Sequence, residues 1–317
     1  MSTLPLRRHR AALIGVALAA VLATVACEPL PTDATQEPTV VGNCTASGTR
    51  TCTQLTVGGT ARKFYTHRSP QLSPVTGRPV VLFFHGDGGT GAANLASLYA
   101  RTDLDGAIVV QMDGLSNTWS FYMDGTHVDD VAFTKAVVDG IKAGTLLTGL
   151  HIDPHRIYAI GNSRGGFMVN TLTVDSRSAG LFAAVAPVAG NFYCETGDAV
   201  CTARVNGNGM AISSALVSVN GDADPVVSPP AVVPTPPTAT ITGWPWPHAS
   251  MSYAHGCATN FAHVVELTPS MSGKPTYLYR PAGACSHELL MVLVKGGGHG
   301  VSGWETPVWN WLRSHSN

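Results

Sequence analysis

Six short apolar runs that alternate with stretches of helical patterning constrain the fold of this chain more than any other feature. The runs are too continuous for strands with one solvent-facing side, so we expect strands that are buried on both faces. They are Pro79–Phe84, Ala107–Met112, Ile157–Ile160, Ala183–Val188, Ala215–Val219 and Leu289–Val294. Strands and helices that alternate in this way predict an α/β fold with a mainly parallel central sheet flanked by helices.

The helical stretches complete this pattern. They are expected at Ala92–Ala100, Val128–Leu147, Arg164–Leu172, Ser250–Ala254 and Pro307–Ser314. Ahead of them, Gln54–His67 alternates apolar and polar residues around Gly58 and Gly59, which predicts a β-hairpin at the start of the folded body. Open sheets of this class bind ligands at the carboxyl ends of their strands, so we expect the functional residues at that edge.

The N-terminal segment is typical of an exported protein. Three arginines precede the apolar run Ala11–Ala26, so residues 1–26 have the pattern of a signal peptide, and the apolar run is shorter than a typical membrane span. Residues 27–48, with several Pro and Thr, are expected to form an extended tether. The residues before Cys27 loosely resemble a bacterial lipoprotein box, so we expect either secretion or a lipid anchor at Cys27.

The remainder, residues 49–317, has the composition of a single folded domain. The chain is 44% hydrophobic and 12% charged, which is enough apolar surface to bury a substantial core. One segment, residues 225–248, contains eight prolines and ends near Trp244 and Trp246, so it cannot form an ordinary helix or a central strand. We interpret it as an irregular surface excursion or, alternatively, as a stiff rim of the binding site whose tryptophans face a sugar ring or a polymer chain.

Charge and cysteine content narrow the partners of the chain. Its 19 basic and 20 acidic residues are spread without a basic stripe, so no nucleic acid is expected. Six cysteines follow Cys27, and an even number in an exported chain predicts disulfide bonds. Proximity suggests the pairs Cys44 with Cys52, Cys194 with Cys201, and Cys257 with Cys285. Zinc is the alternative, but the ligand spacings typical of zinc are missing from the sequence, so no metal is expected.

A Gly-x-Ser-x-Gly pattern marks a candidate nucleophile. It spans Gly161–Gly165, directly after the apolar run Ile157–Ile160 and at the start of an expected helix. This pattern builds a sharp strand-to-helix turn that holds its serine in a strained and exposed position. We therefore predict that Ser163 is a catalytic nucleophile.

A serine hydroxyl needs a base to take its proton and an acid to orient that base, and in this type of fold they follow the serine in the order acid, histidine. Asp224 follows the run that ends at Val219 and is the expected acid, with Asp222 as the alternative. His299 lies in a glycine-rich loop after the last apolar run and is the expected base. The histidines outside that loop are expected to be surface or packing residues; they include His248, His255 and His287.

The negative charge of a tetrahedral intermediate needs two backbone N–H donors. One is expected from Arg164, the residue after the serine, and the other from Asp87, in the glycine-rich loop that follows the first apolar run. His85 in the same loop could suggest catalysis, but we expect it to shape the loop.

Several ordered motifs over about residues 50–317 resemble one family. They are the His85-Gly86 loop, Trp119, Val128–Val131, Gly161–Gly165, Asn220–Val227, Gly256-Cys257 and Gly296–His299. Together they resemble the polyhydroxybutyrate depolymerase and feruloyl esterase group, which overlaps carbohydrate esterase family 1. The resemblance implies an α/β-hydrolase fold, a triad of Ser163, Asp224 and His299, a Cys257–Cys285 bridge, and a structural role for Asp129 and Asp130 at the start of a helix.

The expected function is that of an exported serine carboxylesterase that works through an acyl-enzyme and needs no cofactor. Feruloyl or acetyl esters on plant polysaccharide are the favoured substrates, and polyhydroxyalkanoate polyesters are the alternative. The chain departs from the family where members often read His-Thr-Trp-Pro-Gly and this sequence has His299–Gly303, so the substrate does not carry over directly. A non-catalytic cell-surface binding protein on the same scaffold and a peptidase of the same fold remain rival hypotheses.

Overall fold

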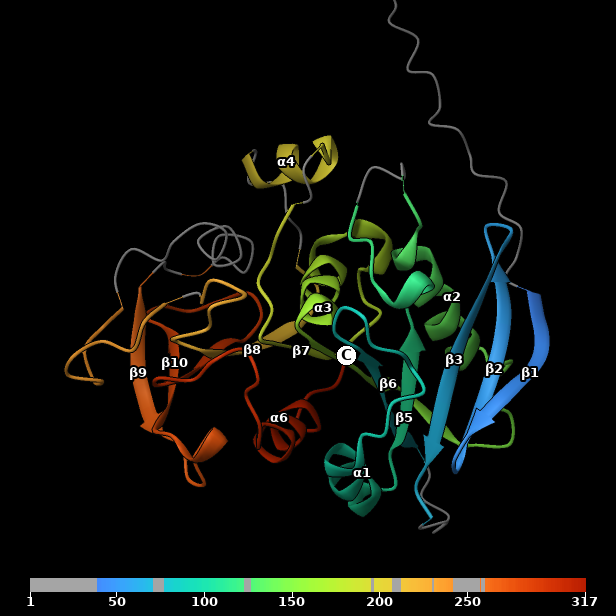
Figure 1. Ribbon diagram of the computed structural model, residues 1–317, viewed down its shortest axis with the longest axis horizontal. Helices are drawn as coiled ribbons and strands as arrows, with labels where there is room; N and C mark the ends of the chain where they lie inside the picture. The colour runs from blue at the N-terminus through green and yellow to red at the C-terminus, as the bar shows by residue number, and fades with distance from the viewer. Residues whose placement is uncertain are drawn as a thin grey trace, which may run out of the picture. The chain divides into compact units, whose positions relative to one another are not determined.

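An eleven-stranded mixed sheet forms the centre of the described part of the chain (Figure 1). The computed structural model describes residues 39–70, 77–122, 127–194, 197–206, 212–229, 231–241, 257 and 260–317, all within the compact unit Gln36–Asn317. The expected signal peptide at residues 1–26 and Cys27 lie outside these ranges, and so does the expected helix Ser250–Ala254.

The strand order of the sheet is β1-β2-β3-β5-β4-β6-β7-β8-β11-β10-β9. The strands are β1 (Thr39–Ser47), β2 (Arg50–Val57), β3 (Thr60–Arg68), β4 (Arg78–Phe84), β5 (Ile108–Asp113), β6 (Ile152–Asn162), β7 (Ala184–Val188), β8 (Ala215–Gly221), β9 (Phe261–Glu266), β10 (Thr276–Pro281) and β11 (Leu289–Val294). From β5 through β11 all neighbours pair in parallel, and the strands outside this block pair antiparallel. All six runs expected to be strands lie in this parallel block.

Two hydrophobic clusters cover the two faces of the sheet, which explains why the central strands are apolar throughout. In β4, Val80 and Leu82 belong to one cluster, and Val81 and Phe83 between them belong to the other. The helices are α1 (Ala96–Thr102), α2 (Asp130–Lys142), α3 (Arg164–Val174), α4 (Ala199–Asn206) and α6 (Glu305–Leu312). Side chains of α2 and α3 pack in the first cluster, and those of α1 and α6 pack in the second, where Figure 1 shows these two helices side by side. No helix in the described ranges has the length and apolar character to cross a membrane.

The tether assigned to residues 27–48 is wrong for its last part, because residues 39–47 form β1. This strand pairs antiparallel with β2, and a disulfide joins Cys44 to Cys52 across the pair. Nearly every side chain of β1 is exposed, so the strand has no buried face that an apolar pattern would reveal. Backbone pairing and the disulfide hold it instead.

Strands β9 and β10 and helix α4 were also not predicted. The side chains of β9 are buried only at Phe261, and Val264 and Val265 are about half exposed, as expected for an edge strand. Helix α4 contains Cys201, which forms a disulfide bond with Cys194 ahead of the helix. The described residues hold a third disulfide between Cys257 and Cys285, so the structure joins the cysteines in the pairs that proximity suggested.

A buried ion pair ties the N-terminal hairpin to helix α2. The Arg62 guanidinium donates to the Asp130 carboxylate, and their side chains are only 2% and 1% exposed. The other Asp130 oxygen accepts from the Ser120 amide at 2.7 Å. Burial raises the pKa of the Asp130 carboxyl above its ordinary value, and the Arg62 charge opposes that rise.

Removing one partner of this pair is expected to be far more damaging than neutralising both. Arg62→Met leaves an unpaired buried carboxylate and should lower the free energy of unfolding by about 3 kcal/mol. Adding Asp130→Asn, which keeps an acceptor for the Ser120 amide, should restore a large part of that loss. Urea unfolding of both variants measures this, and equal stabilities for the single and the double variant would contradict it.

Candidate active site

The side chains of Ser163, His299 and Asp224 meet at the carboxyl edge of the sheet. Ser163 follows β6, Asp224 lies three residues after β8, and His299 lies five residues after β11. The His299 Nε2 is 2.8 Å from the Ser163 Oγ, and its Nδ1 is 2.8 Å from an Asp224 carboxylate oxygen. The imidazole thus links the hydroxyl to the carboxylate, which is the geometry in which a base can take the serine proton.

The turn that carries Ser163 is strained and tightly packed. Ser163 has φ 53° and ψ −120°, an unusual backbone conformation for a residue with a Cβ. Its amide donates to the Val188 carbonyl at 2.8 Å, which fixes the turn against β7. A Cβ on Gly161 would lie 2.0 Å from the Gly165 oxygen, and one on Gly165 would lie 2.2 Å from the Phe84 oxygen. Only glycine therefore fits on either side of the serine.

The structure distinguishes the two candidate acids. Asp224, whose side chain is 1% exposed, faces His299 with one oxygen and accepts the amides of Val226 and Val227 with the other, at 2.8 and 2.9 Å. Asp222 instead accepts backbone amides on both of its oxygens, one from Gly296 and one from Val233 at 3.1 Å. Asp222 therefore joins the histidine loop to the proline-rich segment. Both of its oxygens accept backbone amides, whereas Asp224 is the aspartate bonded to the imidazole.

His85 lies in the loop after β4 and serves as a structural residue in this geometry. Its Nε2 accepts the Gly114 amide at 3.0 Å, which requires that nitrogen to be unprotonated, and its Nδ1 donates to the Gly86 carbonyl at 2.8 Å. Burial lowers the pKa of the His85 imidazole below its ordinary value, in agreement with a neutral ring. Both ring nitrogens are occupied by backbone groups, so the ring shapes the loop.

The two amides expected to stabilise an oxyanion belong to the first residue of helix α3 and to the loop after β4. Arg164 begins helix α3, where first-turn amides point away from the helix. Asp87 lies in the loop whose Gly86 would place a Cβ 3.4 Å from the Ser163 Cβ, so this loop runs directly beside Ser163. The Arg164 Nε also lies 3.8 Å from an Asp87 carboxylate oxygen.

One segment contacts both the loop after β4 and Arg164 at the start of helix α3, and sequence reasoning did not find this role. We call residues 114–121 the bracing segment. Besides the Gly114 amide on the His85 ring, the Trp119 indole N–H donates to the His85 carbonyl at 2.8 Å, and the Thr118 hydroxyl donates to the Asp87 carboxylate. In the other direction, the Gly88 amide donates to the Asn117 carbonyl at 2.8 Å, and the Arg164 Nε donates to the Trp119 carbonyl at 2.8 Å. These bonds join residues far apart in the chain, and within the bracing segment only Trp119 had stood out in the sequence, as part of the family resemblance.

The remaining residues singled out in the sequence lie in other parts of the described structure or outside it. Trp244, Trp246, His248 and His255 lie outside the described residues. His287 is partly exposed in the turn between β10 and β11. Asp129 caps helix α2 by accepting the Ala132 amide at 2.8 Å. Within the described ranges, no group of three or more His, Cys, Asp or Glu side chains could hold a metal ion.

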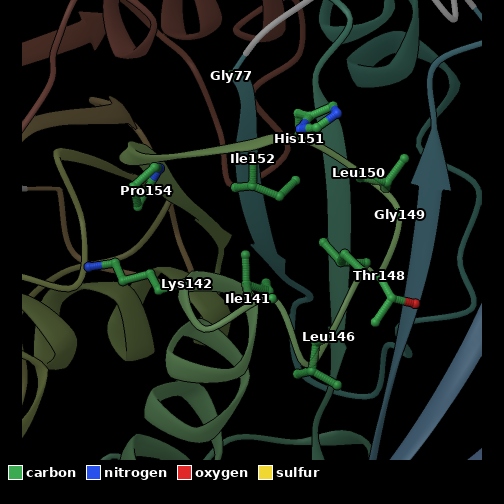
Figure 2. A pocket seen from close by; sticks show the side chains of 12 residues that line it. Gly77, Ile141, Lys142, Leu146, Thr148, Gly149, Leu150, His151, Ile152 and Pro154 are labelled. Carbon is green, nitrogen blue, oxygen red and sulfur yellow. The ribbon is translucent and has the colours of Figure 1, made fainter.

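A cavity of about 370 Å³ lies at the opposite edge of the sheet (Figure 2). Gly77, before β4, and Ile152, at the start of β6, place it at the amino ends of these strands. Leu146, Leu150 and His151 also line it, but no triad residue does. The cavity is therefore separate from the site around Ser163.

Backbone strain at Ser163 can be measured with two variants that both lack the hydroxyl. Ser163→Gly should be more stable to unfolding than Ser163→Ala by about 1 kcal/mol, because glycine adopts a positive φ without a Cβ penalty. Thermal or chemical unfolding of the two variants gives the difference. If Ser163→Ala were equally or more stable, the turn would not store strain.

No protein-family model matches the chain, but comparisons with individual proteins show its fold. The chain is 28% identical to "Putative esterase NocK" of Nocardia uniformis subsp. tsuyamanensis over 261 residues, which cover 72% of this chain and 71% of that protein.

Two solved structures have the same architecture. The acetyl xylan esterase from Aspergillus awamori superposes with a TM-score of 0.52 at 15% identity, over 79% of this chain and 93% of that one. The S-formylglutathione hydrolase from Agrobacterium tumefaciens superposes with a TM-score of 0.52 at 13% identity, over 88% of this chain and 100% of that one. Together with the sheet order and the strained serine turn, these likenesses confirm the fold prediction, and the chain is a protein of the α/β-hydrolase fold.

Proposed function

We propose that the protein is a serine carboxylic ester hydrolase with Ser163, His299 and Asp224 as its catalytic triad. The observation that carries this proposal is the continuous hydrogen-bonded line from the Asp224 carboxylate through the His299 ring to the Ser163 hydroxyl. Sequence similarity to a protein named as a putative esterase supports the same reaction class. A non-catalytic binding protein would have no need to keep all three side chains in this line.

In this proposal the reaction proceeds through an acyl-enzyme. The Ser163 Oγ attacks the ester carbonyl carbon while its proton passes to the His299 Nε2. Asp224 holds the Nδ1–H of the ring, so Nε2 is the nitrogen free to accept, and the carboxylate stabilises the imidazolium that forms. The backbone amides of Arg164 and Asp87 donate to the oxyanion. The alcohol leaves with the proton from Nε2, and water then releases the acid by the same steps in reverse order.

We propose further that the enzyme is exported and acts on feruloyl or acetyl esters of plant polysaccharide, with polyhydroxyalkanoate polyesters as the second candidate. The motif resemblance supports both substrate classes. Three disulfide bonds in the described residues support an oxidising compartment. Membrane attachment, where it occurs, is proposed to be through a lipid at Cys27.

Hydrolysis by the purified protein tests the proposal. The substrates are p-nitrophenyl acetate and butyrate, methyl ferulate, acetylated xylan and short hydroxybutyrate oligomers, with a p-nitroanilide peptide to test the peptidase alternative. Ser163→Ala is expected to remove the activity. The substrate with the highest kcat/KM decides between polysaccharide and polyester. If the folded wild type matched Ser163→Ala on every ester, the binding-protein alternative would replace the enzyme.

The two aspartates provide a matched pair of variants. Asp224→Asn should lower kcat by about 10⁴-fold, because an amide in place of the carboxylate favours the wrong imidazole tautomer and does not stabilise the imidazolium. Its carboxamide oxygen can still accept the Val226 and Val227 amides, so the fold should persist. Asp222→Asn should lower kcat by less than about tenfold, since it contacts only backbone. Steady-state kinetics on p-nitrophenyl acetate measures both, and a reversed order would identify Asp222 as the acid.

A further inference from the structure

Two hollows adjoin at the carboxyl edge of the sheet and share the side chains of Leu115 and Ser116. One has a volume of about 200 Å³ and the other about 230 Å³. We call the pair the edge groove, with the smaller hollow as its inner part and the larger as its outer part. The groove lies at the end of β5, whose last residue, Asp113, lines the outer part. Only β4 lies between β5 and β6, so the ends of β5 and β6 are two strand spacings, or about 10 Å, apart. The groove therefore lies close to the proposed nucleophile.

The inner hollow is the part of the groove that is nearest to Ser163 along the chain. Arg164, the residue after Ser163, lines this hollow, and its side chain donates to the Trp119 carbonyl. The walls are mainly apolar, with Leu115 and Val128 exposed by 38% and 41%, and the buried Trp119 also contributes. Tyr122 adds an aromatic ring. Apolar and aromatic side chains of this kind pack against the C–H face of a ring-shaped ligand.

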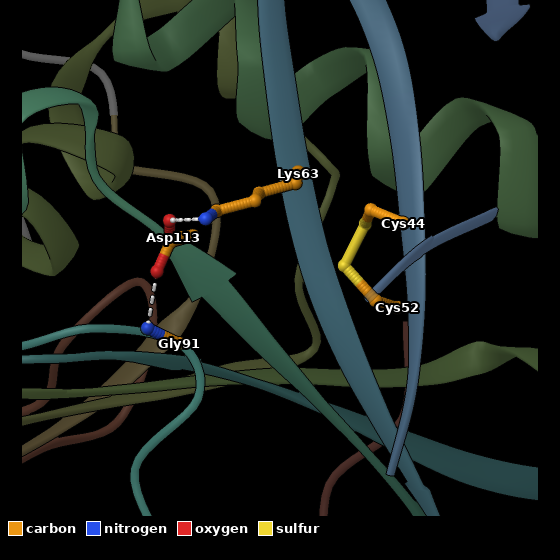
Figure 3. The surroundings of a disulfide bond; sticks show 5 residues. All are labelled: Cys44, Cys52, Lys63, Gly91 and Asp113. Atoms are coloured by element: carbon orange, nitrogen blue, oxygen red, sulfur yellow. Dashed lines mark hydrogen bonds and ion pairs between the residues drawn. A yellow bond between two sulfur atoms is a disulfide. The ribbon is translucent and has the colours of Figure 1, made fainter. Parts of the chain in front are cut away.

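The outer hollow is polar and lies between the β2–β3 hairpin and the bracing segment. The Lys63 ammonium lies 3.4 Å from an Asp113 carboxylate oxygen, and the other oxygen accepts the Gly91 amide at 2.6 Å (Figure 3). Burial alone would lower the pKa of the Lys63 amine, but Asp113 raises it above its ordinary value, so the amine is cationic. Gln54, the partner of Lys63 across the hairpin, and the exposed Asn117 add two carboxamides.

A disulfide stiffens the hairpin wall of the outer hollow. Cys52 lies two residues before Gln54 on β2 and is bonded to Cys44 of β1. Figure 3 shows this bond beside the strand that carries Lys63. A wall that is fixed before the ligand arrives loses less conformational entropy on binding than a mobile one. The polar groups of the outer hollow are therefore preorganised for a ligand.

The chemistry of the two hollows favours a carbohydrate. The outer hollow offers donors from Lys63, Gln54 and Asn117 together with acceptors from Asp113 and the same carboxamides. Hydroxyl groups both donate and accept, so a sugar can satisfy all of them. The repeating unit of a polyester has only acceptor oxygens, so it can accept from these donors but offers no hydrogen to the acceptor atoms of the hollow. The apolar inner hollow suits the less polar face of the same sugar chain.

We propose that the edge groove binds the carbohydrate chain of a sugar ester, with the chain running from Arg164 outward to Lys63. The inference rests on the proposed function for its ester chemistry, and it adds a binding site remote from the triad. Recognition along the groove places one ester of the chain at Ser163. Small esters, which do not reach past Leu115, do not use it.

Selectivity between a sugar ester and a small ester tests the groove. The variant is Leu115→Ala with Asn117→Gly, and glycine suits the φ of 61° at residue 117. The measured quantity is kcat/KM on acetylated xylo-oligosaccharides divided by kcat/KM on p-nitrophenyl acetate. This ratio should fall about tenfold, the effect of one or two lost contacts. The matched control is Leu104→Ala, an exposed leucine before the amino end of β5, which should leave the ratio as in the wild type.

Binding without turnover separates the groove from the proposed reaction. Calorimetry with unesterified xylohexaose and Ser163→Ala should show binding that weakens about tenfold when the two groove substitutions are added. An unchanged ratio together with unchanged xylohexaose binding would overturn the groove. A ratio that falls for hydroxybutyrate oligomers but not for sugar esters would also overturn it, in favour of a polyester chain. If the wild type hydrolysed no ester but bound xylohexaose through the groove, the proposed function alone would fail.

Discussion

The geometry of the site depends on a backbone contact that excludes side chains. The turn at Ser163 presses against the carbonyl oxygens of β4 so closely that Gly165 has no room for a Cβ, and the amide of Ser163 is fixed to β7. Because β6 lies between β4 and β7, the turn is held by its two neighbours in the sheet. The unusual backbone angles of Ser163 are maintained by this packing, and they direct its hydroxyl to the loop after β11.

A second constraint acts through polar groups. One proposed oxyanion donor lies in the loop after β4 and the other at the start of helix α3, and neither element fixes its own position relative to the other. The bracing segment contacts both, through the Asp87 loop on one side and the Arg164 side chain on the other. The neutral ring of His85 is part of this arrangement, because a protonated Nε2 could no longer accept the Gly114 amide. The presence of a histidine in the loop next to Ser163 is therefore explained by its tautomer and burial without a role in proton transfer.

The sequence predicted those parts of the fold that bury apolar side chains on a regular period. The central strands and the strand-to-helix turn at Ser163 were predicted for this reason, and so were the positions of Asp224 and His299 after two of those strands. Strand β1 was missed because it has almost no buried side chain, and the choice between Asp222 and Asp224 stayed open because both follow β8 within a few residues. The bracing segment was missed since its bonds link residues that are about 30 to 45 positions apart, which no local pattern encodes.

The bracing segment also joins the two proposals. Its backbone and buried indole contact the two elements that would donate to the oxyanion. Its exposed side chains, Leu115 and Ser116, line both hollows of the edge groove. A ligand in the groove would therefore contact the same segment that positions Asp87 and Arg164. Interactions with a remote part of a substrate can in this way contribute to the geometry at the reacting carbon, which is how binding energy raises kcat as well as affinity. On the proposed model a short ester would not use this contribution, because it would reach Ser163 without touching the segment's exposed face.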